Sequence, residues 1–569
     1  MGRSSSKEGS RNWCKRSGFP SPTKNSSRCY SDVAERLEAR VGLHQMSGRY
    51  HKTPRTIETD YDVTDTALGS GLNGVVRLAT SKSYPSHKYA VKAFDFAGVP
   101  LSKREQLESE VEVFLAIDHP NIARLSDVYE YEEHISLVME YMEGGELFDR
   151  LSRLKRFTEA EAARTVWQML LALNYIHSHG IIHGDVKLEN FMYDSVDCNH
   201  LKLIDFGFSK MKTGDTGSLQ NKRICGTVSY IAPEALELKF STKCDQWSLG
   251  VVVFVLLAGY MPFTGSQRDQ MRKIAEGRYV MKEERWGDIS AEAKHFTQAL
   301  LQNDSALRIS AQAALNHPFL QSCRTQSTKE VDSSVAYALR DFAHQSRFRR
   351  CCLSMIAWSL SNEERAKVEE IFLAIDEHHT GTITFDEWKK VMVDKFHLPT
   401  GEVKKAFQAL DTHHDKEIHY SDFVAAMVDT RIQLNDEHMY EAFRKFDTND
   451  VGYITLGDLR EVLGDTVEGE RVEHFLEEAD PLKRGYITYH EFVAYVTGRP
   501  LHLHGDEVAS FPEDGLEFEG TRRGRRSPTL SSFDWLPDVV RQHVPKGTRH
   551  ARGASGHKNH EQPVCCTLQ

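Results

Sequence analysis

The spacing of hydrophobic and polar residues changes along the chain and divides it into regions. Residues 1–60 show no hydrophobic period and are rich in Ser, Arg and Lys. From Tyr61 onwards, the segments YDVTDTAL, GVVRLAT and KYAVKAF predict short strands separated by turns. Helical spacing then dominates as far as His317, as in EAEAARTVWQMLLALNYIHSHG. The pattern predicts an unstructured basic extension over 1–60, followed by a bilobal α+β region over 61–320.

A repeat occupies the next large part of the chain. Polar loops begin at Asp376, Asp411, Asp447 and Asp480, at steps of 35, 36 and 33 residues, and each has Ile at its eighth position. Helical segments flank every loop, which is the layout of EF-hands. We therefore predict an all-α, calmodulin-like region over 359–498, with four loops at 376–387, 411–422, 447–458 and 480–491.

A basic amphipathic segment joins these two regions. Within residues 325–358, the stretch Val335–Trp358 is apolar on one face and carries Arg347, Arg349 and Arg350. Such a helix is typical of the targets that calmodulin-like domains grip, so we interpret it as a junction or autoregulatory helix. The alternative is a linker helix packed on a neighbour. Periodicity is lost again over 499–569, where we expect an unstructured tail.

Composition and charge exclude several protein classes. The chain has 569 residues, 40% of them hydrophobic and 27% charged, and its net charge of −11 argues against a nucleic-acid-binding protein. Ten cysteines without C-x-x-C spacing, and a charged start without an apolar core, predict a reducing, intracellular setting. The most apolar run, Leu249–Ala258, is about half the ~20 residues of a membrane span, so we interpret it as a buried core helix.

Six short motifs follow one another in the first region. The first, Gly69-Ser-Gly-Leu-Asn-Gly-Val-Val76, is glycine-rich, so its backbone can close over phosphates without a Cβ in the way. Each motif alone has a structural explanation, such as a turn or an ion pair. Their order and spacing together resemble the protein kinases over residues 61–320. The other five are Tyr-Ala-Val-Lys92, Glu110 in a helical stretch, His183-Gly-Asp-Val-Lys-Leu-Glu-Asn190, Asp205-Phe-Gly207 and Ala232-Pro-Glu234.

This resemblance implies a role for each matching residue. Asp185 accepts the proton of the substrate hydroxyl, Lys187 contacts the moving phosphoryl group, and Asn190 and Asp205 hold Mg²⁺. Lys187 and the pair Gly226-Thr227 indicate the serine/threonine class. Glu140 and Met142 lie in the hinge beside adenine, with Met139 behind it, and Glu146 meets ribose and a basic residue of the target. The residues expected around ATP are Leu68, Gly69, Ser70, Gly71, Leu72, Asn73, Gly74, Val75, Val76, Ala90, Lys92, Glu110, Glu140, Met142, Glu146 and Met192. Asp245 and the pair Glu234 and Arg308 are expected to be structural.

Gly184 departs from the kinase pattern. Many kinases have an Arg at this position, and it pairs with a phosphorylated residue of the activation segment. Gly184 cannot form such a pair, although the residues expected to contact ATP, Mg²⁺ and the hydroxyl are present. We therefore expect an active enzyme that needs no phosphate on Thr213, Thr216 or Ser218.

The whole order of regions resembles one kinase family. A kinase region, a basic junction helix and four EF-hands over 61–498 are similar to the calcium-dependent protein kinases of plants, ciliates and apicomplexan parasites. The resemblance implies that the junction blocks or fails to support the kinase at low calcium. It also implies that calcium-loaded EF-hands grasp and rearrange the junction.

The loops nevertheless depart from what calcium requires, which is oxygen at positions 1, 3, 5, 9 and 12 and usually Gly at position 6. The first loop keeps most of this set, and its candidate calcium ligands are Asp376, Thr380, Thr382, Thr384 and Glu387. Its third position is His378, however. The departures in the later loops are His413 and Lys416 in the second, Val451 in the third, and Leu482 and Arg484 in the fourth. We interpret His378 and His413 as surface residues, not as ligands of a softer metal, and expect a weakened calcium response.

Both ends of the sequence carry candidate lipidation motifs. Met1-Gly2-Arg-Ser-Ser-Ser6 fits the pattern for N-myristoylation of Gly2, and Cys566-Thr-Leu-Gln569 fits C-a-a-X prenylation of Cys566. Chance occurrence is the alternative for both. A basic start and a lipid together would attach the chain to the cytoplasmic face of a membrane.

These observations predict a serine/threonine protein kinase that transfers the γ-phosphoryl group of ATP. Its cofactor is Mg²⁺, and Ca²⁺ is a further candidate. The expected partners are protein substrates with a basic residue upstream of the target, the chain's own junction helix with its EF-hand domain, and a membrane surface. A catalytically poor, membrane-tethered scaffold with a kinase fold is the alternative, and the poor loops disfavour a third option, a calcium buffer.

Overall fold

A computed structural model of the chain describes residues 49–499, apart from 54, 72–73, 97–98, 132–133, 197, 212–218, 221–226, 322, 324–330 and 433. The predictions for residues 1–48 and for the tail after residue 499 lie outside the described residues, as do the lipidation candidates Gly2 and Cys566. The described residues form one compact unit. The bilobal region and the EF-hand region both belong to this unit.

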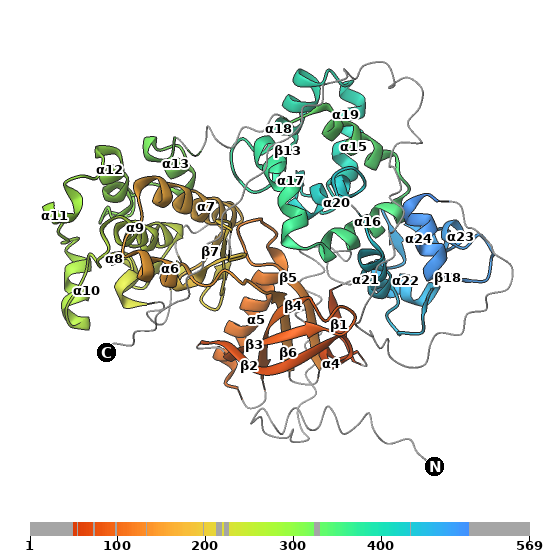
Figure 1. Cartoon of the computed structure of the whole chain (residues 1–569), viewed down its shortest axis with the longest axis horizontal. Coiled ribbons are helices and arrows are strands. Elements are labelled where there is room, and N and C mark those ends of the chain that lie inside the picture. Colours follow the sequence, from red (N-terminus) through yellow and green to blue (C-terminus); the bar gives the residue numbers. More distant parts are fainter. Residues whose placement is uncertain are drawn as a thin grey trace, which may run out of the picture. The chain divides into compact units, whose positions relative to one another are not determined.

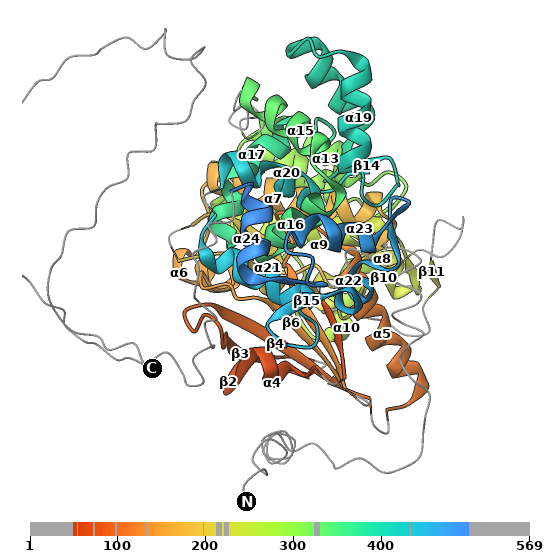
Figure 2. The same cartoon turned by 90° about the vertical axis from the view of Figure 1, so that its right-hand side faces the viewer.

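The small lobe is a six-stranded sheet in the order β1-β5-β6-β4-β3-β2 (Figure 1). Neighbouring strands are antiparallel except β1 and β5, which are parallel. In both views α5 (Leu101–Ala116) lies beside this sheet (Figures 1 and 2). The strands are β1 (Tyr50–Lys52), β2 (Tyr61–Gly71), β3 (Gly74–Ser81), β4 (Lys88–Asp95), β5 (Leu125–Tyr131) and β6 (His134–Glu140).

Part of the extension that we expected to be unstructured is ordered, so the predicted boundary at Tyr61 is wrong. In β1, Tyr50 pairs with Val128 of β5, and the Tyr50 hydroxyl donates to Glu130 at 2.8 Å. Helix α4 (Ile57–Asp60) follows and leads directly into β2. A three-residue strand is too short to show an alternating pattern, and its partner strand lies far along the chain.

The large lobe is organised around α7 (Glu159–Ser178) and α9 (Thr242–Ala258). Thr158 and Glu161 form a capping box that satisfies backbone N–H groups at the start of α7. Helix α9 ends at Gly259, whose φ of +74° is a left-handed conformation that glycine adopts without strain. From Leu249 onwards every residue of α9 is buried, which confirms the interpretation of this apolar run as a core helix.

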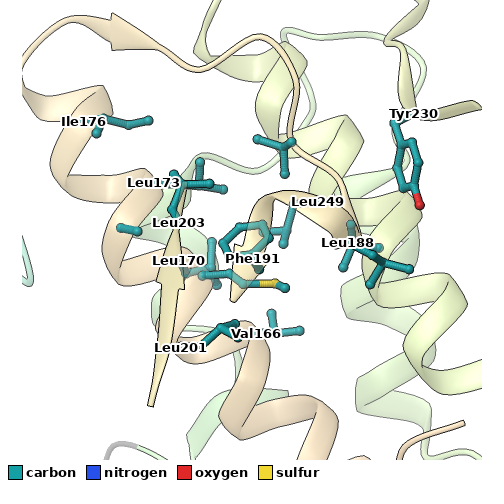
Figure 3. Close-up of a cluster of buried hydrophobic side chains, with 14 of the residues drawn as sticks. Val166, Leu170, Leu173, Ile176, Leu188, Phe191, Leu201, Leu203, Tyr230 and Leu249 are labelled. Atoms are coloured by element: carbon teal, nitrogen blue, oxygen red, sulfur yellow. The ribbon is translucent and has the colours of Figure 1, made fainter. Parts of the chain in front are cut away.

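A cluster of apolar side chains anchors the segments that carry the motifs (Figure 3). Val166, Leu170, Leu173 and Ile176 lie on one face of α7 because they are spaced by three or four residues. All four are fully buried. Since burial of one such side chain contributes ~1.5–3 kcal/mol, this core holds the loop that follows β7 firmly in place. The partners labelled in Figure 3 are Leu188, Phe191, Leu201, Leu203, Tyr230 and Leu249.

The large lobe has further short elements. They are α6 (Leu147–Leu154), β7 (Ile181–Ile182), η1 (Leu188–Asn190), β8 (Phe191–Tyr193), β9 (Leu201–Leu203), β10 (Lys210–Met211), β11 (Leu219–Gln220), η2 (Val228–Tyr230), α8 (Pro233–Leu236), β12 (Lys239–Phe240), α10 (Gln267–Ala275), α11 (Glu283–Trp286), α12 (Ala291–Leu300), α13 (Ala311–Leu315) and η3 (Pro318–Leu320).

The predicted junction helix is two helices instead of one. Helix α15 (Ser333–His344) ends before Gln345, whose backbone is extended, and α16 (Arg347–Ser359) begins after Ser346. The Ser346 side chain accepts a hydrogen bond from the backbone N–H of Arg349, so it caps the second helix. The apolar spacing continues across this break, which is why periodicity alone predicts a single helix.

The four predicted EF-hands are present, which confirms this part of the fold class. The eighth residues of paired loops lie opposite each other in short antiparallel strands, Ile383 with Ile418 and Ile454 with Ile487, and all four are fully buried. The elements are α17 (Asn362–Ile375), β13 (Ile383–Thr384), α18 (Phe385–Lys389), η4 (Lys390–Lys395), α19 (Thr400–Leu410), β14 (Glu417–Ile418), α20 (Tyr420–Arg431), α21 (Asp436–Phe446), β15 (Tyr453–Thr455), α22 (Leu456–Leu463), β16 (Thr466–Val467), β17 (Glu470–Arg471), α23 (Val472–Ala479), β18 (Tyr486–Thr488) and α24 (Tyr489–Thr497).

The loop of the first EF-hand packs against α7. The side-chain amide of Asn174 donates to the carbonyl oxygen of His379 at 2.6 Å. Gly381 leaves no free space, because a Cβ there would lie 2.5 Å from Tyr175 Cδ2 and 2.6 Å from His119 Cδ2. The tip of this loop is therefore in direct contact with the large lobe.

Candidate active site

Lys92, Glu110 and Asp205 meet between the two lobes. The Lys92 ammonium, on β4, is hydrogen-bonded to Glu110 of α5 and lies 3.0 Å from Asp205 Oδ1. Burial alone would lower the pKa of Lys92, but the two carboxylates raise it above its ordinary value. Burial likewise opposes ionisation of Asp205, yet Lys92 lowers its pKa. These shifts favour the charged forms of both Lys92 and Asp205 at neutral pH.

Asp185 is the centre of the loop that follows β7. Its Oδ2 accepts a hydrogen bond from the Lys187 ammonium at 2.5 Å, and its Oδ1 accepts from the Thr227 backbone N–H at 3.0 Å. The side-chain amide of Asn190 donates to the Asp185 carbonyl at 2.8 Å. Because the Asn190 nitrogen is used in this way, its amide oxygen remains for a cation. The three residues predicted as catalytic are thus within contact of one another.

The residues expected to be structural make hydrogen bonds and an ion pair within the large lobe. Asp245 of α9 accepts hydrogen bonds from the backbone N–H groups of His183 and Gly184, both at 2.9 Å. These bonds attach the loop that follows β7 to α9. Glu234 and Arg308 form a two-point salt bridge at 2.5 and 2.9 Å. These contacts are consistent with the structural roles that the resemblance implies.

Gly184 occupies a position that favours glycine. Its φ is +80°, and a Cβ there would lie 3.0 Å from the carbonyl oxygen of Phe208. A side chain at this position would therefore be strained and crowded. Glycine therefore fits this position without strain, and it brings no cation to the loop.

The residues expected around ATP lie on strands of both lobes and at the start of α6. Gly71 pairs with Gly74 in the β2–β3 hairpin, Ala90 of β4 pairs with Met139 of β6, and a bridge joins Glu146 to Met192. Leu72 and Asn73 lie outside the described residues, and Ser70 and Gly71 are described by their backbone only. Val76 packs against the core, whereas Val75 is 39% exposed, because successive strand residues face opposite sides. Leu68 is exposed to a similar extent, Gly69 pairs with Val76, and Met142 is buried.

The Glu140 side chain has partners that the sequence did not reveal. Its carboxylate accepts hydrogen bonds from Lys202 of β9 at 2.7 and 2.9 Å and from Arg365 of α17 at 3.1 Å. The side chain is therefore directed away from the expected adenine position, and only its backbone remains for the predicted hinge contact. No sequence signal connects charged residues so far apart, since ion pairing leaves no periodic pattern.

An acidic group lies beside Lys187. Burial, followed by the negative charges of Asp149 and Glu189, raises the pKa of Glu146 above its ordinary value. Carboxylates that repel one another in this way are stabilised by an incoming cation.

In all four EF-hand loops, the carboxylate at position 12 has a nitrogen atom of the same loop beside it. In the first three loops this nitrogen comes from position 3: His378 Nδ1 is 2.7 Å from Glu387, His413 Nδ1 is 3.4 Å from Asp422, and Asn449 Nδ2 is 2.9 Å from Asp458. In the fourth loop, Arg484 Nη2 of position 5 is 2.5 Å from Glu491 Oε2.

The first loop meets the requirements of calcium only in part. The Asp376 carboxylate is fully buried and accepts the backbone N–H groups of Thr380 and Gly381 at 3.0 and 2.7 Å. Both Glu387 oxygens accept hydrogen bonds from the loop itself, one from His378 and the other from Thr384. The Thr382 hydroxyl donates to Glu417 of the second loop at 2.6 Å. Oxygen atoms are available at most ligand positions of the first loop. His378, however, occupies the third position and contacts the ligand at the twelfth position, Glu387.

The interpretation of both loop histidines as surface residues is wrong for His413. The His378 side chain is 62% exposed, but that of His413 is only 10% exposed. The His413 ring packs on His419, with ring centroids 4.0 Å apart. Packing within the second loop therefore buries a residue that loop composition predicts to be solvent-exposed.

Comparisons with known proteins agree with this geometry. The chain matches the protein kinase domain family over residues 63–320 and the EF-hand domain pair family over residues 365–428 and 436–497. It is 33% identical over 455 residues to calcium-dependent protein kinase 32 of Arabidopsis thaliana, covering 78% of this chain and 82% of that protein. It is 36% identical over 382 residues to calcium-dependent protein kinase 3 of Oryza sativa subsp. japonica, covering 66% and 68%.

The chain belongs to the calcium-dependent protein kinases.

Membership confirms the predicted fold class and general function. This calcium-dependent protein kinase is a serine/threonine protein kinase regulated by a C-terminal EF-hand domain, and it uses ATP and Mg²⁺. Asp205 and Asn190 provide a carboxylate and an amide oxygen, the donors that Mg²⁺ prefers, so these residues fit the cation. Within residues 49–499 as described, no group of three or more His, Cys, Asp or Glu side chains is arranged to hold a metal ion. No helix in the same part of the chain is long and apolar enough to cross a membrane.

Proposed function

We propose that this kinase uses Asp185 as the group that accepts the proton of the substrate hydroxyl and Lys187 as the cation for the transferred phosphoryl group. Asn190 and Asp205 would hold Mg²⁺, which supplies charge neutralisation on the phosphates when bound. This proposal rests on the hydrogen bonds that the Asp185 carboxylate accepts, from the Lys187 ammonium at 2.5 Å and from the Thr227 backbone N–H at 3.0 Å. These contacts hold the buried carboxylate in a fixed orientation.

Full-length protein with Mg-ATP and basic peptides tests these roles. We expect Asp185→Asn to lower kcat by about 10²- to 10⁴-fold, because the general base is lost while the loop contacts through Thr227 remain. Lys92→Met serves as the blank for contaminating kinases, and circular dichroism checks that both variants fold. If wild-type protein labels no peptide in either chelator or calcium, the alternative of a catalytically poor scaffold holds instead.

We also propose that the preferred substrates carry a basic residue upstream of the phosphorylated hydroxyl. The raised pKa of Glu146, caused by burial and by Asp149 and Glu189, supports this proposal. A peptide library with Arg or Ala at each upstream position measures the preference. Charge reversal by Glu146→Lys should remove it, whereas a preference that survives this change would assign recognition to other residues.

Activity without phosphorylation of the activation segment is a further part of the proposal. The left-handed backbone at Gly184 supports it, since no arginine is present there to pair with a phosphate. The candidate acceptors Thr213, Thr216 and Ser218 lie outside the described residues. Replacement of all three by Ala should leave turnover within about twofold, and a collapse of turnover would contradict the proposal.

We propose that the calcium response of the EF-hand domain is weakened. His378 at the third position of the first loop and Arg484 at the fifth position of the fourth support this view, because each places nitrogen where calcium requires oxygen. The first loop, with Asp376, Thr380, Thr382, Thr384 and Glu387, is the remaining candidate site. Calorimetry on the full chain checks it, and binding tighter than about 10 μM would contradict a weakened response.

Membrane attachment through Gly2, with basic residues of the start adding electrostatic attraction, is a separate proposal. One acyl chain binds membranes only weakly, so the basic residues or the second candidate at Cys566 would be needed as well. Gly2→Ala and Cys566→Ser, tested singly by cell fractionation, should each move protein to the soluble fraction. Retention of both variants in the membrane pellet would reject attachment by lipid.

A further inference from the structure

A buried charge cluster connects the hinge of the kinase with the first EF-hand. Glu140, at the end of β6, accepts hydrogen bonds from Lys202 at 2.7 and 2.9 Å and from Arg365 at 3.1 Å. It also accepts one from the Arg124 backbone N–H at 2.8 Å. Glu140, Lys202 and Arg365 are 6%, 2% and 7% exposed, so these contacts are sheltered from solvent.

The two cations reach Glu140 from different parts of the chain. Lys202 belongs to β9, immediately upstream of the segment that carries Asp205. Arg365 belongs to α17 of the first EF-hand, and the backbone oxygen of Arg365 accepts the Tyr420 hydroxyl at 3.2 Å, which ties it to α20. Arg365 is thus fixed within the EF-hand domain while its guanidinium contacts the hinge.

A neighbouring residue of α17 strengthens this connection. The Asn362 side-chain oxygen accepts a hydrogen bond from Lys202 at 3.0 Å, and its nitrogen donates to Asp194 at 2.5 Å. Arg124 of the small lobe donates to the carbonyl oxygens of Trp358 and Leu360, at 2.6 and 3.0 Å, where α16 ends. The same face of the kinase is therefore held by both the junction and the first EF-hand.

The charges explain why Arg365 matters for the hinge. Burial opposes the ionised form of Glu140, and Lys202 and Arg365 together lower its pKa below the ordinary value. A buried carboxylate that loses one of two cationic partners must find a new hydrogen bond or move towards solvent. Movement of Glu140 would displace the adjoining backbone as far as Met142, which the kinase resemblance places beside adenine.

We propose that Arg365 is a positioning residue for the nucleotide: by holding the Glu140 carboxylate, the EF-hand domain fixes the hinge that receives the adenine ring. This inference rests on the proposed function only for the location of the hinge. It assigns a route by which the EF-hand domain acts on ATP binding, and that route requires no ion in any EF-hand loop.

Substitution of Arg365 in the full-length chain tests the assignment. We expect Arg365→Met to raise both the KM for ATP and the Kd for ADP on the order of tenfold, with kcat changed by less than about threefold. Arg365→Lys, which keeps a cation, should restore most of the affinity. The control Arg349→Met removes a similar guanidinium, 3.2 Å from Asp429 and remote from the hinge contacts, and should change affinity by less than about twofold.

A double-mutant cycle with Glu140→Gln separates this route from a general loss of stability. In that background Arg365→Met should change the Kd for ADP by less than about twofold, because the carboxylate through which it acts is already gone. Calorimetry with ADP needs no turnover, so an inactive chain would refute the proposed function and still report on Arg365. Unchanged ADP affinity in Arg365→Met, equal shifts in the control, or a tenfold shift in the Glu140→Gln background would each overturn the inference. If the Arg365→Met variant does not fold, the Kd for ADP is compared for Arg365→Lys with and without Glu140→Gln.

Discussion

A matched pair of glycine substitutions measures how firmly the first EF-hand loop holds the kinase. Gly381 and Gly485 occupy the same sixth position of the first and fourth loops, with φ of +79° and +85°. Alanine at either position must adopt a left-handed backbone, which costs about 1–2 kcal/mol. The intrinsic cost is therefore shared, and any difference between the variants reports on what surrounds each glycine.

The surroundings differ sharply. A Cβ at Gly381 would lie 2.5 Å from Tyr175 Cδ2 and 2.6 Å from His119 Cδ2, while nothing lies within 4 Å of a Cβ at Gly485. Since carbon atoms in contact are ordinarily ~3.5–4.0 Å apart, the first loop must withdraw by about 1 Å. Overpacking of this kind costs about 1–3 kcal/mol, and withdrawal also weakens the bond between Asn174 and the His379 carbonyl, worth about 0.5–1.5 kcal/mol.

These contributions add to about 1.5–4.5 kcal/mol in the contact between loop and α7, beyond the effect of Gly485→Ala. Such a difference corresponds to about a 10- to 2,000-fold change in the equilibrium between docked and undocked loop. Hydrogen–deuterium exchange on the full chain detects it in peptides that cover the end of α7 and residues 379–382. We expect faster exchange at both places in Gly381→Ala than in Gly485→Ala, in chelator and in calcium alike.

Two results would refute this reasoning. Equal exchange at the end of α7 in both variants would show that the loop does not hold the large lobe. Protection in the unmodified chain that disappears in chelator would show that docking depends on calcium. Asn174→Ala provides an independent check from the kinase side, with a smaller effect in the same direction because only one hydrogen bond is lost.

Two further predictions concern charged residues outside the active site. Arg484→Ala should destabilise the chain by about 3 kcal/mol in urea titrations, because it leaves the buried Glu491 carboxylate without its cation. The control Arg471→Ala, at an exposed pair, should change stability by less than about 1 kcal/mol. Similar unfolding midpoints for the two variants would contradict a structural role for Arg484. His200, 3.2 Å from Glu369, has a pKa raised to about 9: burial lowers it, but the neighbouring carboxylates raise it more. The protonated His200 therefore stabilises the folded chain fully below its unfolded pKa of about 6.5, and this stabilisation of about 3 kcal/mol is lost as pH rises through 9. A His200→Gln variant whose unfolding free energy falls equally over that pH range would refute this.

The kinase chemistry could be predicted from the sequence because each group lies in a short motif. Asp185, Lys187 and Asn190 are separated by a few residues, so one loop conformation brings them together whatever the remainder of the fold does. The paired isoleucines of the EF-hands are predictable for the same reason, since the loop geometry fixes the eighth position.

The remaining features depend on contacts between distant segments. The β1 strand is stabilised by pairing with β5, far along the chain. The break between α15 and α16 is the exception, because the local cap at Ser346 starts a new helix although the apolar spacing continues. The salt bridge between Glu140 and Arg365 joins residues on separate domains, and charge alone does not specify which of many partners a carboxylate selects. Burial of His413 depends on how its ring packs on His419 within the second loop, which residue types alone do not specify.

The fourth loop shows why a degenerate EF-hand can keep its shape without an ion. Arg484 places a guanidinium 2.5 Å from Glu491, the carboxylate that would contact calcium at two points. A calcium ion entering this loop would have to displace that cation and then lie near it. The double charge of calcium and the single charge of Arg484, about 5 Å apart at an effective dielectric constant of 20, repel by about 7 kcal/mol. The contacts from the EF-hand domain to the kinase, through the His379 carbonyl and through Arg365, likewise use protein groups only. We therefore expect the domain to support the hinge at resting calcium, so that its attachment to the kinase, and not ion occupancy of the fourth loop, sets the level of activity.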